Sequence, residues 1–220
     1  MHSVDSVISV GDEHDILLCA RISSDQANRD PKLLGYLIRQ SHWSPFEMIS
    51  ANVQIETTRD IGRQVLRHRS FSFQELSGRY AENDAIYGKR DLRFKGITNR
   101  QGSRAPATEA EVEVVRDFSR RMADVGLACK ALYDEMVAAG IATECARSIL
   151  PEGLTPTFMC MNGTARSWIH YLRERLKLDP DGVPFAQLEH YWLAKQIERT
   201  LRERWPILFG SLDAIGYLDS

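Results

Sequence analysis

Basic side chains, most of them arginine, are concentrated in one stretch of this sequence. Residues 59–104 contain eleven Lys or Arg against five Asp or Glu, whereas the whole chain carries a formal net charge of −2. Arginine presents a planar fork of N–H donors that matches phosphate oxygens two at a time. The local excess therefore predicts a phosphate-binding segment. A solvated basic face is the alternative that charge alone leaves open.

The order of residues inside this stretch favours the first interpretation. If residues 60–68 form a helix, Gln64, Arg67 and His68 lie at i, i+3 and i+4 and project from one face. Glu75 follows soon after, so an amide, a guanidinium, an imidazole and a carboxylate occur close together along the chain. These groups together predict a nucleotide site.

A second group of polar residues follows at once. Ser77 and Arg79 flank Gly78, which has no Cβ and lets the backbone approach a ligand closely. Serine and arginine donate hydrogen bonds to phosphate, so these three residues extend the predicted nucleotide site.

These residues also carry a resemblance. Arg67, His68 and Arg69, then seven residues, then Ser77, resemble the R-H-R-x7-S signature of the flavin-dependent thymidylate synthases. HWSPFE at 42–47 is similar to the family's H-x-S/T-P-F-E, and ARSILP at 146–151 is similar to its A-R-x-x-L-P. Residues 165–175 and 186–189 resemble further family blocks. The resemblance covers most of the chain.

The resemblance implies an activity and its cofactors. Members of the family methylate dUMP to dTMP with methylenetetrahydrofolate as carbon donor and FAD, reduced by NADPH, as hydride carrier. It implies homotetramers whose sites are shared between subunits. No G-x-G-x-x-G or P-loop pattern is present, so the sequence offers no dinucleotide fingerprint and FAD is expected on the arginine-rich segment.

The resemblance also implies a role for individual residues. The expected FAD contacts are Ser44, Arg67, His68, Arg69, Glu75, Thr164, Arg166 and His170. The expected dUMP contacts are Gln64, Arg67, Glu75, Ser77, Gly78, Arg79, Arg147 and Arg175. His42 is expected beside flavin and folate, and Arg175 is the expected catalytic residue. Gln74, Thr164 and His170 depart from the residues most frequent in the family.

Two lines of reasoning disagree about the arginine nearest the uracil ring. On an ideal helix Arg166, His170 and Arg173 share a face, while Arg175 falls nearly opposite Arg166. Helical geometry alone selects Arg173. The resemblance selects Arg175, which requires the helix to end or bend near residues 172–176.

The elements that must position these residues alternate between short strands and longer helices without a steady βαβ rhythm. This pattern predicts an α+β fold with a mixed or antiparallel sheet, not a Rossmann fold. Strands are expected at 4–10, as an edge strand, and at 50–57 and 157–161. Helices are expected at 13–22, 31–40, 60–68, 108–140, 143–150, 165–176 and 185–205. Loops are expected at 70–76 and 95–107, and a turn at 179–184.

The long helix has the clearest boundaries. The Thr108 hydroxyl can cap its first turn while Glu111 reaches back, and Gly140 is a natural stop. Its apolar stripe is expected to be core; the stripe comprises Val112, Val115, Phe118, Met122, Val125, Leu132 and Met136.

Composition bounds the remaining possibilities. A chain of 220 residues, 43% hydrophobic and 26% charged, suits a single soluble domain over residues 1–220, with room for two lobes. No run resembles a signal peptide or membrane span, so a cytoplasmic protein without membrane partners is expected. The four cysteines are widely spaced and expected to be reduced and mostly buried, Cys145 as a packed residue, and no metal site is indicated.

A nucleic-acid-binding module is the main rival interpretation. Phe71, Phe73, Tyr80, Tyr87 and Phe94 interleave the basic residues and could stack on bases. The spacing of His68, Glu75 and Ser77 favours the nucleotide enzyme, so no nucleic-acid partner is expected. A non-catalytic scaffold is a third interpretation, and it explains none of the arginine clusters.

Overall fold

The computed structural model describes residues 2–22, 30–79, 90–96 and 102–218. Helices and strands both contribute substantially, which confirms the predicted α+β class. The chain divides into two compact units. Unit 1 contains Glu56–Arg67 and Glu75–Met159, and unit 2 contains His2–Ile55, His68–Gln74 and Cys160–Ser220.

The larger sheet has the strand order β1-β2-β6-β3. Its strands are β1 (Ser3–Val10), β2 (Ser50–Thr58), β3 (Ser72–Glu75) and β6 (Pro156–Thr164). β1 lies at an edge, as predicted. In β2 the alternate residues Ala51, Val53, Ile55 and Thr57 are buried, which confirms the period read from the sequence.

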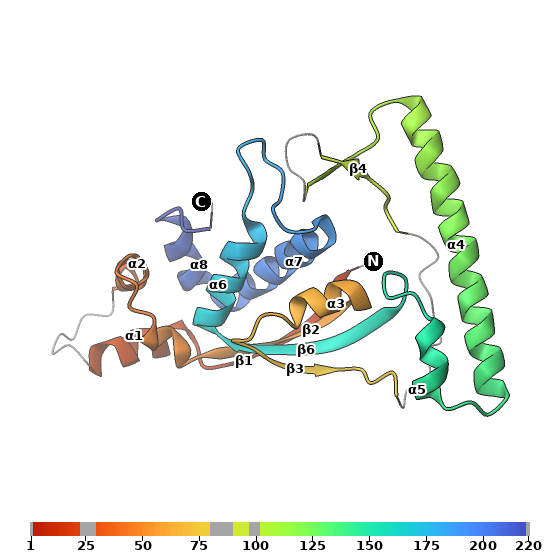
Figure 1. Ribbon diagram of the computed structural model, residues 1–220. Coiled ribbons are helices and arrows are strands. Elements are labelled where there is room, and N and C mark those ends of the chain that lie inside the picture. The colour runs from red at the N-terminus through yellow and green to blue at the C-terminus, as the bar shows by residue number, and fades with distance from the viewer. Residues whose placement is uncertain (1, 23–29, 80–89, 97–101, 219–220) are drawn as a thin grey trace. The chain divides into compact units, whose positions relative to one another are not determined.

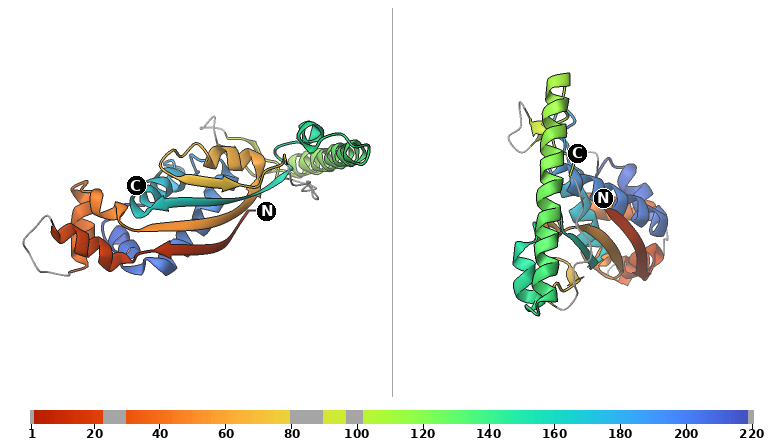
Figure 2. Two further views of the ribbon diagram at one scale, coloured as in Figure 1. Left: turned by 90° about the horizontal axis from the view of Figure 1, so that it is seen from below. Right: turned by 90° about the vertical axis from the view of Figure 1, so that its right-hand side faces the viewer.

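The predicted helices of unit 2 are present with similar bounds, as α1 (Glu13–Ile22), α2 (Lys32–Arg39), α6 (Ala165–Leu176) and α7 (Leu188–Arg204). Unit 2 also contains the short 3-10 helix η1 (Ser44–Glu47) and the helix α8 (Pro206–Asp213), which were not predicted. α7 packs along β1 and beside α6 (Figures 1 and 2). Trp168 of α6 is fully buried, and its indole N–H donates to the Ala51 carbonyl of β2 at 3.1 Å. This contact fixes α6 on the sheet.

The turn between α6 and α7 forms where the sequence predicts it. The Asp179 carboxylate accepts hydrogen bonds from the backbone N–H groups of Asp181, at 3.0 Å, and Val183, at 2.8 Å. Gly182 has a φ of 77°, a left-handed conformation that glycine adopts without strain.

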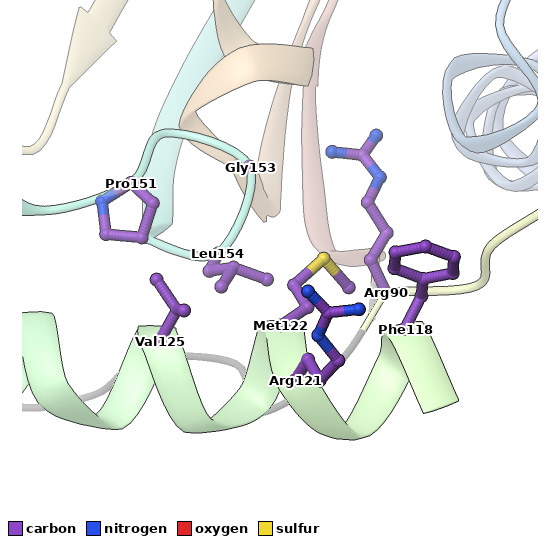
Figure 3. Close-up of a pocket in the computed structure, with 8 residues that line it drawn as sticks. All are labelled: Arg90, Phe118, Arg121, Met122, Val125, Pro151, Gly153 and Leu154. Carbon is purple, nitrogen blue, oxygen red and sulfur yellow. The ribbon is translucent and has the colours of Figure 1, made fainter. Parts of the chain in front are cut away.

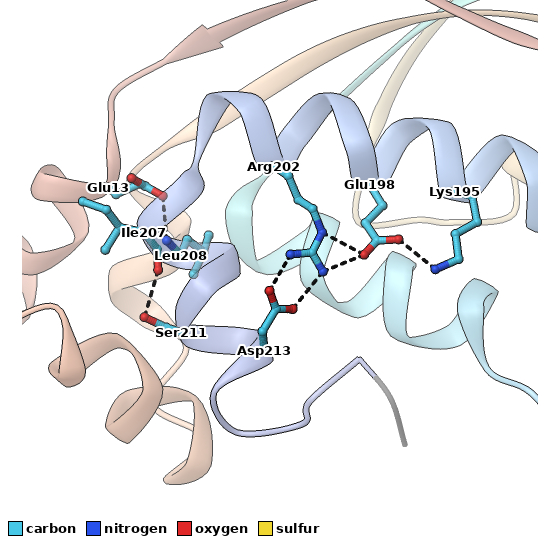
Figure 4. Close-up of polar contacts among 8 residues, drawn as sticks. All are labelled: Glu13, Lys195, Glu198, Arg202, Ile207, Leu208, Ser211 and Asp213. Carbon is cyan, nitrogen blue, oxygen red and sulfur yellow. Dashed lines mark hydrogen bonds and ion pairs between the residues drawn. The ribbon is translucent and has the colours of Figure 1, made fainter.

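α8 is an element that the sequence interpretation missed. α7 ends at Arg204, and a separate helix starts at Pro206, a favoured residue type for a first helical turn. The buried Glu13 carboxylate accepts a hydrogen bond from the Leu208 N–H at 2.6 Å (Figure 4). Burial raises the pKa of Glu13, while this bond opposes the rise. Glu13 thus caps α8 from a distant part of the chain.

A chain of ion pairs joins α7 to α8. Arg202 binds both carboxylate oxygens of Asp213, at 2.7 and 2.8 Å, and also donates to Glu198, which in turn accepts from Lys195 (Figure 4). The hydrogen bond from Arg202 holds the pKa of Asp213 below its usual range. The two-point geometry makes this pair stronger than an ordinary surface ion pair.

Asp213→Asn is expected to lower the free energy of unfolding by about 1 kcal/mol, because it removes one charge of a two-point pair that is only partly exposed. The loss should begin to shrink as the pH falls below roughly 4, the ordinary value in the unfolded chain, and should disappear only below the lowered pKa of the folded carboxylate. Urea unfolding at pH 7 and at a series of pH values below roughly 4 measures both effects. Asp117→Asn, which breaks exposed pairs on another helix, is the matched control and should change nothing measurable. A loss of equal size in both variants would contradict this reasoning.

Unit 1 is built around its long helix. Its elements are α3 (Arg59–Val65), α4 (Glu109–Ala138), α5 (Thr143–Ala146), the 3-10 helix η2 (Arg147–Ile149) and the antiparallel pair β4 (Phe94–Lys95) and β5 (Ser103–Arg104). The predicted cap of α4 is confirmed, since the Thr108 hydroxyl accepts from the Glu111 N–H at 3.2 Å and the Glu111 carboxylate reaches back to the Ala107 N–H.

The apolar stripe of α4 is not core within this chain, so that prediction is wrong for most of its members. Phe118 is 51% exposed and Val125 is 60% exposed. Only Gly126 and Tyr133 of α4 are buried, and Tyr133 packs on Ala146 of α5. Phe118, Met122 and Val125 instead line an open apolar pocket of about 440 Å³ against residues 151–154 (Figure 3). Periodicity shows which residues share a face and not what covers that face.

Several local predictions also need correction. α3 ends at Val65, three residues early, because the chain tightens into a turn in which the Arg67 N–H donates to the Gln64 carbonyl. The expected loop at 70–76 contains β3, and the expected loop at 95–107 contains β5. None of the four cysteines is buried, and Cys145 is exposed because short α5 packs through Ala146.

Among the described residues, no helix is both long enough and apolar enough to cross a bilayer.

Candidate functional site

Arg175 and His68 form the centre of the candidate site in unit 2. The Arg175 Nε donates a hydrogen bond to His68 Nε2 at 2.9 Å. Arginine is always a donor, so His68 Nε2 must carry a lone pair and the imidazole proton must sit on Nδ1. Within the part of the chain that the structure describes, the two Nη groups of Arg175 have no hydrogen-bond or ion-pair partner. They are therefore available to a ligand.

His68 stays neutral at physiological pH. Burial, with a smaller effect from the neighbouring Arg175 charge, lowers the pKa of His68 to about 4. A neutral imidazole fixes the guanidinium plane of Arg175 and adds no negative charge beside it. The full positive charge of Arg175 remains available for an anionic or polarised ligand.

His68 packs against a buried pair of polar residues, Tyr171 and His190. The Tyr171 ring lies edge-on to the His68 ring, with centroids 4.8 Å apart, and the Tyr171 hydroxyl lies 3.1 Å from His190 Nε2. Burial, together with the Arg175 charge, lowers the pKa of His190 to about 3. Burial also raises the pKa of Tyr171. Both groups are therefore neutral over the working pH range.

The opposite face of α6 carries the basic residues that helical geometry grouped together. Arg166 forms an ion pair with Glu47 of η1. Arg173 donates to the Tyr217 hydroxyl at 3.0 Å and lies over its ring. Trp43 packs edge-on against His170 at 4.5 Å. Burial, and then the charges of Arg166 and Arg173, lower the pKa of His170.

The start of α6 holds the segment that carries His68. The Thr164 hydroxyl caps α6 at the Ser167 N–H, and the Ser167 hydroxyl donates to the Ser70 carbonyl at 3.0 Å. A Cβ on Gly163 would lie only 2.4 Å from the Phe71 ring, so this position requires glycine. Phe71 is therefore locked against β6.

A basic pocket forms the candidate site of unit 1. It measures about 380 Å³, and its charged lining comprises Arg59, Arg63 and Arg147 with Glu144 and Glu152. Arg63 is paired with Glu152 at 2.5 Å. Neither Arg59 nor Arg147 makes a side-chain hydrogen bond or ion pair with any residue in the described ranges. Two cationic groups are thus available at this pocket, which suits an anionic ligand.

The end of β3 supplies the remaining predicted residues of unit 1. The Arg79 Nε donates to the Glu144 carboxylate at 3.2 Å, and its backbone N–H donates to the Ser77 hydroxyl. Glu75 accepts a hydrogen bond from the Thr157 hydroxyl at 2.6 Å. Gly78 is buried in the turn that follows β3. Glu144 and Arg147 both line the basic pocket, so Arg79 is joined to it through Glu144.

The predicted site residues fall into two groups. Unit 1 contains Gln64, Arg67, Glu75, Ser77, Gly78, Arg79 and Arg147, all of them expected dUMP contacts. Unit 2 contains His42, Ser44, His68, Arg69, Thr164, Arg166, His170 and Arg175. The expected single helical face of Gln64, Arg67 and His68 is wrong, because α3 ends at Val65 before the last two.

α6 ends at Leu176, inside the range 172–176 in which the sequence argument required an end or a bend. Arg175 is still helical and lies one turn beyond Tyr171, on the face that meets His68. Arg173 lies on the other face with Tyr217. The expected bend is therefore unnecessary.

Two functional candidates escaped the sequence interpretation. His190 is a lone histidine in the sequence, a type of residue that is more often at the surface or satisfied in the core than a ligand, and the structure places it in the core, bonded to Tyr171. The sequence signal that could have drawn attention to its partner Tyr171 is the spacing of four residues between Tyr171 and Arg175, which places both on one helix face. Glu144 lies three residues before Arg147, and only its contact with Arg79 reveals it.

One of the aromatic residues that the nucleic-acid interpretation required for base stacking is buried. Phe71 is buried and packs edge-on against Trp168 at 4.7 Å, so it is not available to a base. Tyr80 and Tyr87 lie outside the described residues. Among the residues that are described, no three His, Cys, Asp or Glu side chains gather in a way that could hold a metal ion.

Comparison with known proteins adds independent findings. Residues 7–207 match the family described as thymidylate synthase complementing protein. The flavin-dependent thymidylate synthase of Synechocystis sp. is 40% identical over 200 residues, which cover 90% of this chain and 88% of that relative. A probable flavin-dependent thymidylate synthase of Paramecium bursaria Chlorella virus 1 is 36% identical over 210 residues, covering 91% and 90% of the two chains.

A solved structure is also similar. The UMP/dUMP methylase PolB from Streptomyces cacaoi, bound with 5-Br UMP, has a TM-score of 0.80 and 29% sequence identity. The match covers 98% of this chain and 95% of that one. The similarity therefore extends along nearly the whole chain and is not confined to one motif.

Proposed function

The chain belongs to the flavin-dependent thymidylate synthases, and we propose that it converts dUMP to dTMP by reductive methylation. Membership makes the protein an enzyme, a methyltransferase. In the proposed reaction methylenetetrahydrofolate donates the carbon, and FAD reduced by NADPH carries the hydride. One observation supports this proposal most directly. The Arg175 Nε is held by a neutral His68, while the Nη groups remain available to a ligand.

The donor set of unit 2 fits a flavin dinucleotide. Arg166 and His170 lie on one face of α6, and His170 packs against Trp43. Hydrogen-bond donors suited to a diphosphate thus lie near an aromatic ring suited to a flat ring system. The proposed FAD contacts are Ser44, Arg67, His68, Arg69, Glu75, Thr164, Arg166 and His170. When bound, FAD supplies the two-electron chemistry that no side chain provides.

The basic residues of unit 1 fit the nucleotide. In the pocket lined by Arg147, three arginines outnumber two carboxylates, an excess that suits a phosphate dianion. The proposed dUMP contacts are Gln64, Arg67, Glu75, Ser77, Gly78, Arg79 and Arg147, with Arg175 at the uracil ring. We propose that Arg79 and Arg147 bind the phosphate and that Glu75 accepts from the sugar or base.

Arg175 has the chemistry that methylation at C5 requires. C5 must carry electron density to form a bond with the electrophilic carbon donor, and the Nη groups can donate hydrogen bonds to a uracil ring on which this negative charge develops. A carboxylate partner would offset the guanidinium charge, whereas the neutral His68 leaves it intact. His68 thus orients the donor without weakening it. No cysteine is needed as a nucleophile in this proposal.

We propose that residues 1–220 act as one catalytic domain in a homotetramer located in the cytoplasm. The exposed apolar side chains of α4 support an oligomer, because Phe118, Val125 and Leu132 would otherwise meet water. If sites are shared between subunits, each site can take its contacts from more than one chain. His42, exposed after α2, is proposed to lie beside flavin and folate.

The protein is expected to bind FAD and, once NADPH has reduced the flavin, to oxidise it again in a dUMP-dependent reaction. Purified protein should show the visible absorption of a flavin, or take it up from added FAD. After anaerobic reduction by NADPH, addition of methylenetetrahydrofolate with dUMP should restore the oxidised spectrum and yield dTMP. Omitting dUMP is the control. Protein that stays colourless and is not stabilised by FAD would remove the proposed function.

UMP is the second substrate to test, because the similar solved protein is a UMP/dUMP methylase. The same assay with UMP in place of dUMP measures the preference directly. Turnover with UMP alone would replace dUMP in the proposal while leaving the methyltransferase assignment intact.

A further inference from the structure

The Tyr171 and His190 pair is an unusual feature of a protein core. Both side chains are essentially inaccessible, with Tyr171 1% exposed and His190 fully buried. A buried hydroxyl and imidazole lose their water contacts and need each other as partners, a need that apolar side chains of similar shape would not create. The packing of α6 on α7 therefore does not by itself explain why polar residues stand here.

The position of the pair suggests its use. Tyr171 lies one helical turn before Arg175, and its ring contacts His68 edge-on. The His190 ring lies 6.1 Å from the His68 ring. The two residues thus form the surface on which His68 rests, while His68 in turn holds the Arg175 Nε. Any shift of Tyr171 would be transmitted to the guanidinium through His68.

The surroundings of the pair disfavour a charged His190 at working pH. Burial, and then the charges of Arg175, His68 and His2, lower the pKa of His190, which also faces the Tyr171 hydroxyl. Tyr171 likewise remains protonated. A directional hydrogen bond between two neutral groups fixes position without adding charge beneath Arg175.

We propose that Tyr171 and His190 are positioning residues, which lock α6 to α7 at the turn that presents Arg175 and so hold His68 and Arg175 in one arrangement. This inference rests on the proposed function of Arg175. Small misplacements of a catalytic group cost large factors in rate, so a residue acting through His68 can matter without touching substrate.

The double variant Tyr171→Phe/His190→Leu separates positioning from simple core stability. It replaces both polar groups by apolar ones of similar shape, so a merely structural pair should be dispensable and the variant should turn over normally. The positioning role predicts a fall in kcat of about tenfold or more, with KM for dUMP within about twofold and FAD occupancy unchanged. His190→Gln, which keeps an acceptor for the Tyr171 hydroxyl, should recover much of the rate.

A second measurement needs neither flavin nor substrate. Hydrogen–deuterium exchange at the histidine C2 position, followed by mass spectrometry across pH, reports the pKa of each imidazole. His68 in the wild type should titrate near 4 and should move toward the ordinary value of roughly 6.5 in the double variant, as its packing loosens. The exposed His14 serves as an internal reference.

Tyr133→Phe is the matched control, because it removes an equally buried hydroxyl from the core of unit 1. It should leave His68 exchange and kcat at wild-type values. If the double variant does not fold, Tyr171→Phe alone, which keeps the ring, carries the same two readouts. Wild-type kcat together with an unshifted His68 pKa would overturn the proposal. If the His68 pKa shifts in the double variant but the wild-type protein does not convert dUMP, the contact that positions His68 is supported. Only the proposed function is then contradicted.

Discussion

Arg175→Ala is expected to lower kcat for dTMP formation by about a hundredfold to a thousandfold, the usual cost of removing one preorganised donor from a developing anion. The reason is that the Nη groups of Arg175 act on charge that exists mainly in the transition state. FAD occupancy should change little, because Arg175 is a proposed dUMP contact and is not among the proposed FAD contacts. Steady-state kinetics and flavin absorbance per protein chain measure the two effects separately.

Arg173→Ala is the matched control from the same helix. Arg173 is exposed and engaged with Tyr217, through a hydrogen bond at 3.0 Å and a cation–π contact at 4.6 Å. Its removal should change kcat by no more than about threefold, as for other surface substitutions. Collapse of turnover in Arg173→Ala with survival in Arg175→Ala would reverse the assignment of the two residues.

Arg175→Lys tests the role of geometry. Lysine keeps the charge but has one ammonium group, so it cannot bond His68 and present two further donors in a plane. A loss of about tenfold or more is expected. Full activity in this variant would show that charge alone suffices and that the His68 contact is dispensable.

The conflict over Arg173 and Arg175 shows what helical periodicity can and cannot predict. It correctly grouped Arg166, His170 and Arg173, which meet η1 and Tyr217 on one face of α6. It could not predict that the opposite face also carries functional residues. The position of His68 depends on contacts between residues about a hundred positions apart in the sequence, and a local pattern contains no information on them.

Sequence patterns predicted the structure correctly where contacts between neighbouring residues determine it. The Thr108 cap, the turn at Asp179 and the alternation in β2 involve neighbouring residues, and all three are confirmed. The failures involve distant partners. The end of α3 and the exposure of the α4 stripe depend on what packs against those residues, which propensity does not reveal.

The Tyr171 and His190 pair shows the same limit for the site. In the sequence the two residues stand 19 positions apart on two different helices, and no local pattern links them. A lone histidine on a helix is more often a surface residue or a satisfied core residue than a ligand, and His190 is a core residue. Only the contact between α6 and α7 places it beneath His68, so the function proposed for the pair required the fold.

Arg79→Ala is expected to weaken dUMP binding about tenfold to a hundredfold. A hydrogen bond to a charged group contributes roughly 1.5–3 kcal/mol, and Arg79 follows Ser77 and Gly78 in the segment proposed to bind the phosphate. Isothermal titration of the FAD-loaded protein with dUMP measures the change. Titration with deoxyuridine, which lacks the phosphate, is the control and should give the same affinity in wild type and variant.

A Glu144 variant tests this prediction further, because the Glu144 carboxylate accepts a hydrogen bond from the Arg79 Nε at 3.2 Å. A phosphate that binds Arg79 must compete with this carboxylate, and exposed ion pairs of this kind contribute about 0.2–1 kcal/mol. Glu144→Gln should therefore tighten dUMP binding by about two- to fivefold. In the Arg79→Ala background most of that gain should vanish, since the competition no longer exists, and only the smaller effect of a lost negative charge beside Arg147 should remain. An undiminished gain in the double variant would mean that Glu144 acts on the pocket as a whole, and unchanged dUMP affinity in Arg79→Ala would remove Arg79 from the phosphate site.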